Sequence, residues 1–195
     1  MKNKKIFLGI FLTMVILFFS CFQKQDTESD FIAEPIDGGK AVQIIEYIGS
    51  KWEINIPSRI QKLPVTHIGE SAFKNKKLIS VTIPNGVTHI GNYAFSQNQL
   101  ANITIPNSVT HIGYDVFSNN KLTSVVIPNS VVEIRQRAFG DNDDLIRIKI
   151  GADVSLVGSD FLNWSFDNAF PVFYNENGKK AGTYIFNNGN WSYKQ

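Results

Sequence analysis

The chain has 195 residues, of which 43% are hydrophobic and 18% charged, a balance typical of a folded protein and not of a disordered one. Its 19 lysines and arginines nearly cancel its 17 aspartates and glutamates, and the net charge of +2 argues against a nucleic-acid-binding protein. The single cysteine, Cys21, excludes an internal disulfide and a cysteine-rich zinc site.

The N-terminus has the pattern of a secretory signal peptide. A basic start, Met-Lys-Asn-Lys-Lys, precedes an apolar run of 14 residues, 6–19. As a helix this run would be about 21 Å long, whereas the hydrocarbon core of a bilayer is about 30 Å thick. We therefore expect residues 1–20 to be a signal peptide and not a permanent membrane span.

The only cysteine follows Ser20 directly at the end of the apolar run, which resembles the lipobox of bacterial lipoproteins. That resemblance implies that Cys21 becomes the first mature residue and carries the lipid. Phe18 and Phe19 depart from the small residue usual there, so an ordinary signal peptide or a short uncleaved anchor stays open as an alternative. Cleavage would remove three lysines and change the net charge from +2 to −1. Residues 23–30 are polar and have no periodicity, so residues 21–30 are expected to form a flexible tether.

The body of the chain is an internal repeat. Residues 78–91 return as 100–113 and again as 122–135, and Pro84, Pro106 and Pro128 lie 22 residues apart. A looser copy begins at Ile54 and carries a five-residue insertion around 62–64, and a fading copy begins at Leu145. Since one such unit buries too little apolar surface alone, we expect residues 56–159 to stack into a mainly β solenoid.

Each repeat has a strand-like half and a corner-forming half. The segment Leu-x-x-Val-x-Ile alternates like a short strand with one buried face, and a proline ends it. The predicted core consists of the inward positions of this strand and one phenylalanine per repeat: Leu78, Val81, Ile83, Leu100, Ile103, Ile105, Leu122, Val125, Ile127, Phe73, Phe95, Phe117 and Phe139. The asparagines three residues after the phenylalanine, Asn98, Asn120 and Asn142, are expected to bond backbone groups in the turn.

The ends of a solenoid require caps. Residues 31–55 predict an N-terminal β cap in which 42–48 and 52–56 form a hairpin around Gly49-Ser50. Residues 160–195 predict a C-terminal β cap of three short strands, at 172–174, 183–186 and 191–193. The tryptophans Trp52, Trp164 and Trp191 all fall in these end regions and are expected to pack within the caps.

The full pattern, Leu-x-x-Val-x-Ile-Pro-x-x-Val-x-x-Ile-Gly-x-x-Ala-Phe, resembles the BspA-like, or treponemal, class of leucine-rich repeats over about residues 54–161. The segment 174–184 is similar to a tail found in spirochaete members. The resemblance implies a curved leucine-rich-repeat solenoid, display on the bacterial surface, and binding to host matrix proteins or to other bacteria.

The outward positions of the predicted strands form the candidate protein-binding surface. They make two columns that are small and neutral at first and basic in the last repeat: Ser80, Asn102, Ser124 and Arg147, then Thr82, Thr104, Val126 and Lys149. A flat polar surface of this kind favours an extended protein contact over a pocket for a small molecule. An ordinary solvated sheet stays open as the other interpretation.

The histidines His67, His89 and His111 recur in Thr-His-Ile-Gly and should stack in one column. A metal site is disfavoured, because the outer two would lie about 9.6 Å apart, two strand spacings. Three stacked imidazolium groups would repel one another, so we expect stability to fall as the pH drops through about 6.5. The sequence shows no nucleophile elbow and no phosphate-binding glycine loop, and we expect neither an enzyme nor a cofactor.

Together these observations predict a protein lipid-anchored in the cell envelope, on the outer membrane and exposed at the surface. Its repeat surface would bind host matrix or bacterial surface proteins in adhesion or host interaction, with no nucleic-acid partner. Two alternatives are a periplasm-facing structural lipoprotein and a carbohydrate-binding module that uses the C-terminal aromatic residues.

Overall fold

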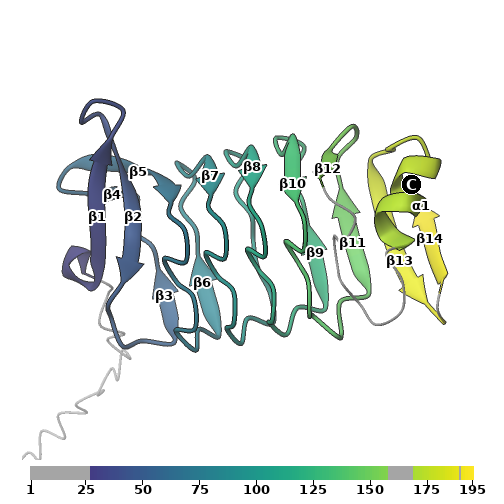
Figure 1. The fold of residues 1–195 in the computed structure, drawn as a ribbon, viewed down its shortest axis with the longest axis horizontal. Helices are drawn as coiled ribbons and strands as arrows, with labels where there is room; N and C mark the ends of the chain where they lie inside the picture. Colours follow the sequence, from purple (N-terminus) through teal and green to yellow (C-terminus); the bar gives the residue numbers. More distant parts are fainter. Residues whose placement is uncertain (1–26, 158–168, 189) are drawn as a thin grey trace, which may run out of the picture.

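The computed structural model describes residues 27–157, 169–188 and 190–195, which form an elongated solenoid of stacked coils with a cap at each end (Figure 1). A coil here means one turn of the solenoid. The elements of the first half are η1 Glu28–Asp30, β1 Phe31–Ile36, β2 Ala41–Tyr47, β3 Glu53–Asn55, β4 Arg59–Ile60, β5 Leu63–Ile68, β6 Ser80–Thr82, β7 His89–Ile90 and β8 His111–Ile112. The second half contains β9 Ser124–Val126, β10 Glu133–Arg135, β11 Arg147–Ile150, β12 Ser155–Val157, α1 Ala169–Glu176, β13 Gly182–Asn187 and β14 Asn190–Lys194.

Successive coils pair through parallel strands on two sides of the solenoid. An eight-stranded sheet has the order β1-β2-β5-β7-β8-β10-β12, with β4 on β5. The other side carries the two-stranded sheet β3-β6 and the four-stranded sheet β14-β13-β11-β9. A 22-residue period places the same residue of each repeat side by side, as in Ile68↔Ile90 and Ile90↔Ile112. The mainly β solenoid that the repeats predicted is thereby confirmed.

The core between the two sides consists of the predicted inward residues. All nine leucine, valine and isoleucine positions of the three clear repeats are buried, with at most 8% of their surface exposed. The four phenylalanines are fully buried and lie face to face, with ring centroids 4.9, 5.5 and 5.4 Å apart. Strand pairing sets a coil spacing of about 4.8 Å, which is also close to the spacing of stacked rings. The same spacing between coils therefore suits both the strand hydrogen bonds and the phenylalanine stack.

Each buried asparagine bonds two neighbouring coils, as the sequence predicted. The Nδ2 group of Asn120 donates to the carbonyl oxygens of Phe95, Phe117 and Ser118 at 3.0, 3.0 and 3.2 Å. Its Oδ1 accepts from the N–H of Leu100, in the preceding coil, at 3.0 Å. Asn98 and Asn142 repeat this arrangement one coil earlier and one coil later. The three side chains form an asparagine ladder through the solenoid.

The glycines that recur at one corner of the repeats are explained by close approach and not by an unusual backbone angle. A Cβ on Gly91 would lie 2.9 Å from the backbone nitrogen of Glu70, and one on Gly113 would lie 2.8 Å from that of Asn92. The left-handed residues lie elsewhere in the corner, for example Tyr93 with φ 58°. Neighbouring coils therefore touch at the glycine, where a side chain has no room.

The predicted N-terminal hairpin is wrong. β2 pairs antiparallel with β1, across the turn Asp37-Gly38-Gly39-Lys40, while β3 pairs in parallel with β6. Residues 52–56 therefore belong to the first coil, because Ile54 lies beside Val81 in the repeat register.

The predicted insertion forms the β4–β5 hairpin. At the start of the described chain, the Gln61 N–H donates to the carboxylate of Glu28 in η1 at 2.9 Å. Residues 28–30, which the sequence assigned to the tether 21–30, therefore belong to the fold.

The C-terminal cap contains a helix where a strand was predicted. Residues 172–174 lie in α1, and β13 and β14 form the expected hairpin. Phe170 and Tyr174, four residues apart, are fully buried on one helix face. The Tyr174 hydroxyl donates to the Gly151 carbonyl at 2.8 Å and accepts from the Val154 N–H at 3.2 Å. Packing against the last coil thus overrides the strand propensity of Val-Phe-Tyr.

Candidate functional site

The eight predicted surface residues lie on one side of the solenoid. Seven are exposed and Ser124 is half-buried. Ser80 and Thr82 lie in β6, Ser124 and Val126 in β9, and Arg147 and Lys149 in β11. Asn102 and Thr104 lie between these strands in a coil that joins this side through the bridge Thr104↔Val126. Val126 is 55% exposed, so the surface has an apolar point among polar residues. We call these eight residues the sheet face.

The sheet face is longer than the sequence predicted, because β13 and β14 continue it. Lys149 pairs with Thr183, which pairs with Lys194, so a third basic side chain joins Arg147 and Lys149 at the C-terminal end. At the other end Glu53 pairs with Ser80. The surface therefore runs from acidic to basic. Sequence reasoning missed Glu53 and Lys194, because both lie in segments that it assigned to the caps.

The histidines do stack in one column, on the opposite side of the solenoid from the sheet face. Their ring centroids are 4.5 and 5.0 Å apart, and the rings are within 4° of parallel. They line a groove of about 410 Å³ with Gln43, Glu70, Asn92, Glu133 and Arg135. Within the described part of the chain, no three His, Cys, Asp or Glu side chains are arranged to hold a metal ion.

Threonine hydroxyls hold the histidines of this column in place. The Thr88 hydroxyl donates to the Thr66 carbonyl at 3.2 Å, and its oxygen lies 2.9 Å from Nδ1 of His89. Thr110 makes the same two contacts, to the Thr88 carbonyl and to His111. Burial, and then the charges of the two neighbouring histidines, lower the pKa of His89, while Asp37 acts in the opposite direction.

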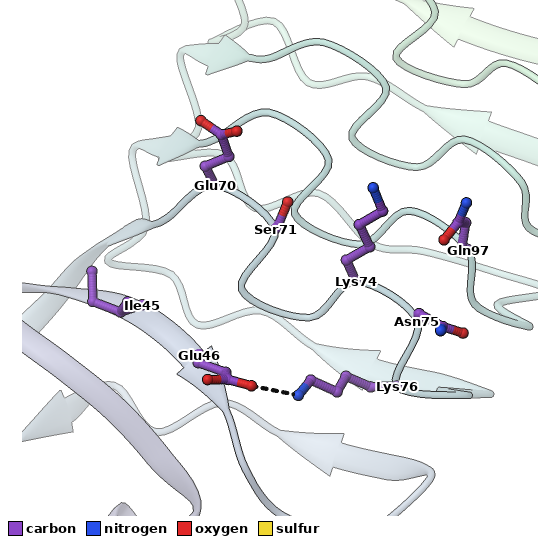
Figure 2. A pocket seen from close by; sticks show the side chains of 8 residues that line it. All are labelled: Ile45, Glu46, Glu70, Ser71, Lys74, Asn75, Lys76 and Gln97. Carbon is purple, nitrogen blue, oxygen red and sulfur yellow. Dashed lines mark hydrogen bonds and ion pairs between the residues drawn. The ribbon is translucent and has the colours of Figure 1, made fainter.

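A second hollow, of about 480 Å³, lies between β2 and the first corner of the solenoid (Figure 2). Its charges are largely satisfied within the protein. The ammonium group of Lys76 contacts the Glu46 carboxylate at 2.8 Å, and that of Lys74 lies 4.8 Å from the centre of the Tyr93 ring. Lys76 occupies the position of the ladder asparagines, and its ion pair ties this corner to the N-terminal cap. The hollow is thus a structural corner and a weak candidate site.

The tryptophans differ in their surroundings. Trp191 is 9% exposed and packs against Phe170 and Phe186, with ring centroids 4.9 and 5.2 Å away, so its indole face is covered. Trp52 is 63% exposed, and the prediction that it packs within a cap is wrong. Trp164 lies outside the described residues. The observed burial removes Trp191 from the carbohydrate-binding alternative.

The proposed anchor, Cys21, and the signal segment 1–20 also lie outside the described residues. Within the part of the chain that the structure covers, no helix is long and apolar enough to cross a membrane.

The 22-residue period, the parallel coil-to-coil pairing and the buried Leu, Ile and Phe columns define a leucine-rich-repeat solenoid. The sequence matches six copies of the BspA type leucine rich repeat region over residues 66–192, and the chain belongs to that family. No curated protein matches the sequence.

Solved structures of leucine-rich-repeat proteins are similar to this chain. One, from T. pallidum, is 23% identical with a TM-score of 0.49 and aligns over 69% of this chain and 86% of its own. One from Eubacterium ventriosum is 20% identical with a TM-score of 0.49, and this chain covers 46% of it. A leucine rich cell surface protein from Faecalibacterium prausnitzii is 19% identical with a TM-score of 0.35, and this chain covers 59% of it.

Proposed function

We propose that this protein is anchored in the bacterial cell envelope through a lipid on Cys21 and binds other proteins through the sheet face, in adhesion or host interaction. The role is binding and not catalysis. The observation that carries the proposal is the sheet face itself, a row of mostly exposed side chains on one side of the solenoid that the packed core supports. Leucine-rich repeats are a general scaffold for such extended contacts.

Charge indicates which partner surface fits best. Arg147, Lys149 and Lys194 share the C-terminal end of the sheet face with the apolar side chain of Val126. A partner with an acidic patch around an apolar contact would complement this end. The small neutral residues of β6 would contribute shape and little energy, because small polar side chains are rarely hot spots.

Binding is tested with the full chain displayed on vesicles and an array of host matrix and bacterial surface proteins. We expect the double variant Arg147→Glu and Lys149→Glu to weaken the best binder about tenfold or more, because it reverses two charges at the contact. The matched control is Lys40→Glu, in the exposed β1–β2 turn away from the sheet face. Equal losses in both proteins would refute the assignment of the surface.

Orientation is tested by protease treatment of intact cells, with a known periplasmic protein as the control. Surface display predicts that residues 31–195 are cleaved while the periplasmic protein survives. Loss only after lysis would refute surface adhesion, and would favour a periplasm-facing structural lipoprotein instead.

A further inference from the structure

Three exposed apolar residues lie on neighbouring segments at the N-terminal end of the solenoid. Trp52 is 63%, Ile48 54% and Ile79 42% exposed. The Ile79 N–H donates to the Trp52 carbonyl at 2.8 Å, so these two residues occupy neighbouring positions on adjacent coils. Ile48 belongs to the same segment as Trp52, the connection from β2 to β3 at the lower left of the solenoid (Figure 1). Exposed apolar clusters of this kind mark contact sites.

This end of the solenoid is also where the N-terminal segment joins the fold. The Ile48 N–H donates at 2.9 Å to the carbonyl of Asp30, the last residue of η1. Thr27 lies six positions after Cys21. Even fully extended, that length of chain spans only about 20 Å. A lipid on Cys21 would therefore hold Ile48, which bonds Asp30, within about 30 Å of the bilayer surface.

We propose that Ile48, Trp52 and Ile79 form a membrane-contact patch that inserts into the headgroup region of the bilayer carrying the anchor. This inference rests on the proposed acylation of Cys21. The chemistry fits, because tryptophan favours the interface between water and hydrocarbon, where aliphatic side chains can bury themselves. The exposed Lys77, two residues before Ile79, can extend its ammonium group to phosphate groups of the lipids.

The position of the patch favours a bilayer over a protein partner, because it lies at the end of the solenoid where the segment that carries Cys21 joins the fold. A tethered surface needs much less intrinsic affinity, since the anchor already supplies a high effective concentration of lipid.

The test is quenching of tryptophan fluorescence by brominated lipid. The full chain, extracted from membranes, is reconstituted into phosphatidylcholine vesicles with plain or brominated acyl chains. We expect brominated vesicles to remove about one third of the emission, because Trp52 is one of three tryptophans. Trp52→Ser should abolish that loss. In the Trp52→Ser background, Ile79→Trp should restore quenching, while Val132→Trp, at a 53% exposed site beside β10, should not.

Mass spectrometry of the same samples separates the two ways in which the idea can fail. An acylated Cys21 with equal emission from plain and brominated vesicles would overturn the membrane contact and leave the anchor standing. An unmodified Cys21 would overturn the anchor, and the contact with it. Quenching restored equally by Ile79→Trp and Val132→Trp would show general proximity to lipid and overturn the patch. A change in Trp52 emission with soluble oligosaccharides and not with brominated lipid would reassign the residue to carbohydrate binding.

Discussion

Replacing Asn120 with alanine should destabilise the solenoid far more than an average polar substitution does. The side chain makes four hydrogen bonds, and the N–H of Leu100 has its bond to Asn120 alone among those described. The carbonyls of Phe95 and Phe117 keep a partner in Asn98 and Asn142. One buried orphan N–H costs about 1–3 kcal/mol, and each lost net hydrogen bond about 1 kcal/mol. We therefore expect a loss of about 3–5 kcal/mol in the free energy of unfolding.

The assay is urea unfolding of residues 21–195 carrying Cys21→Ser, followed by far-ultraviolet circular dichroism. Asn102→Ala, at an exposed position, is the matched control and should change stability by less than about 0.5 kcal/mol. Asn120→Asp keeps the acceptor for Leu100 but turns an oxygen towards three carbonyl oxygens, so it should be no more stable than the alanine variant at neutral pH. An alanine variant within about 1 kcal/mol of the parent would refute the reasoning, because the ladder would then contribute no more than a surface residue.

Three further outcomes follow from the described contacts. The lowered pKa of His89 means that protonation favours the unfolded chain, so stability should fall as the pH drops below about 6.5. His89→Ser should therefore reduce the difference between the melting temperatures at pH 7.5 and at pH 5.5. An unchanged difference would contradict repulsion within the column. Burial raises the pKa of Tyr184 to about 12, so the neutral hydroxyl stabilises the folded state relative to the unfolded chain. This stabilisation should be lost as the pH rises from about 10 towards 12. Melting scans of Tyr184→Phe should show a smaller loss of stability over that range. Gly91→Ala should lower the free energy of unfolding by more than about 1 kcal/mol, because the new Cβ would lie 2.9 Å from backbone atoms. Gly86→Ala is the control, since its Cβ would lie 3.2 Å from the nearest atom. It should lower the free energy of unfolding less in the same urea assay.

The repeats could be predicted in detail, because a fixed period gives each residue type the same surroundings in every coil. The buried Leu, Ile and Phe columns, the asparagine bonds and the stacked histidines all follow from that one fact. The sheet face was also predicted, apart from its division into two sheets at the coil that holds Asn102.

The ends could not be predicted, because there the period gives no information. A local hairpin pattern at 42–56 competed with the repeat register, and the parallel pairing of Ile54 with Val81 prevailed. Likewise Tyr174 looks like a strand residue until the last coil offers its hydroxyl the backbone groups of Gly151 and Val154. Since both outcomes depend on contacts distant in the sequence, local propensity alone predicts neither.

Because every internal junction of this solenoid uses nearly the same contacts, a coil is interchangeable with its neighbour. Segments 78–91 and 100–113 show this, since they share ten of their fourteen residues. Adding or removing one 22-residue unit would lengthen or shorten the sheet face by about 4.8 Å while leaving both caps on the same kind of surface. The length of the sheet face can thus change in discrete steps without a new core.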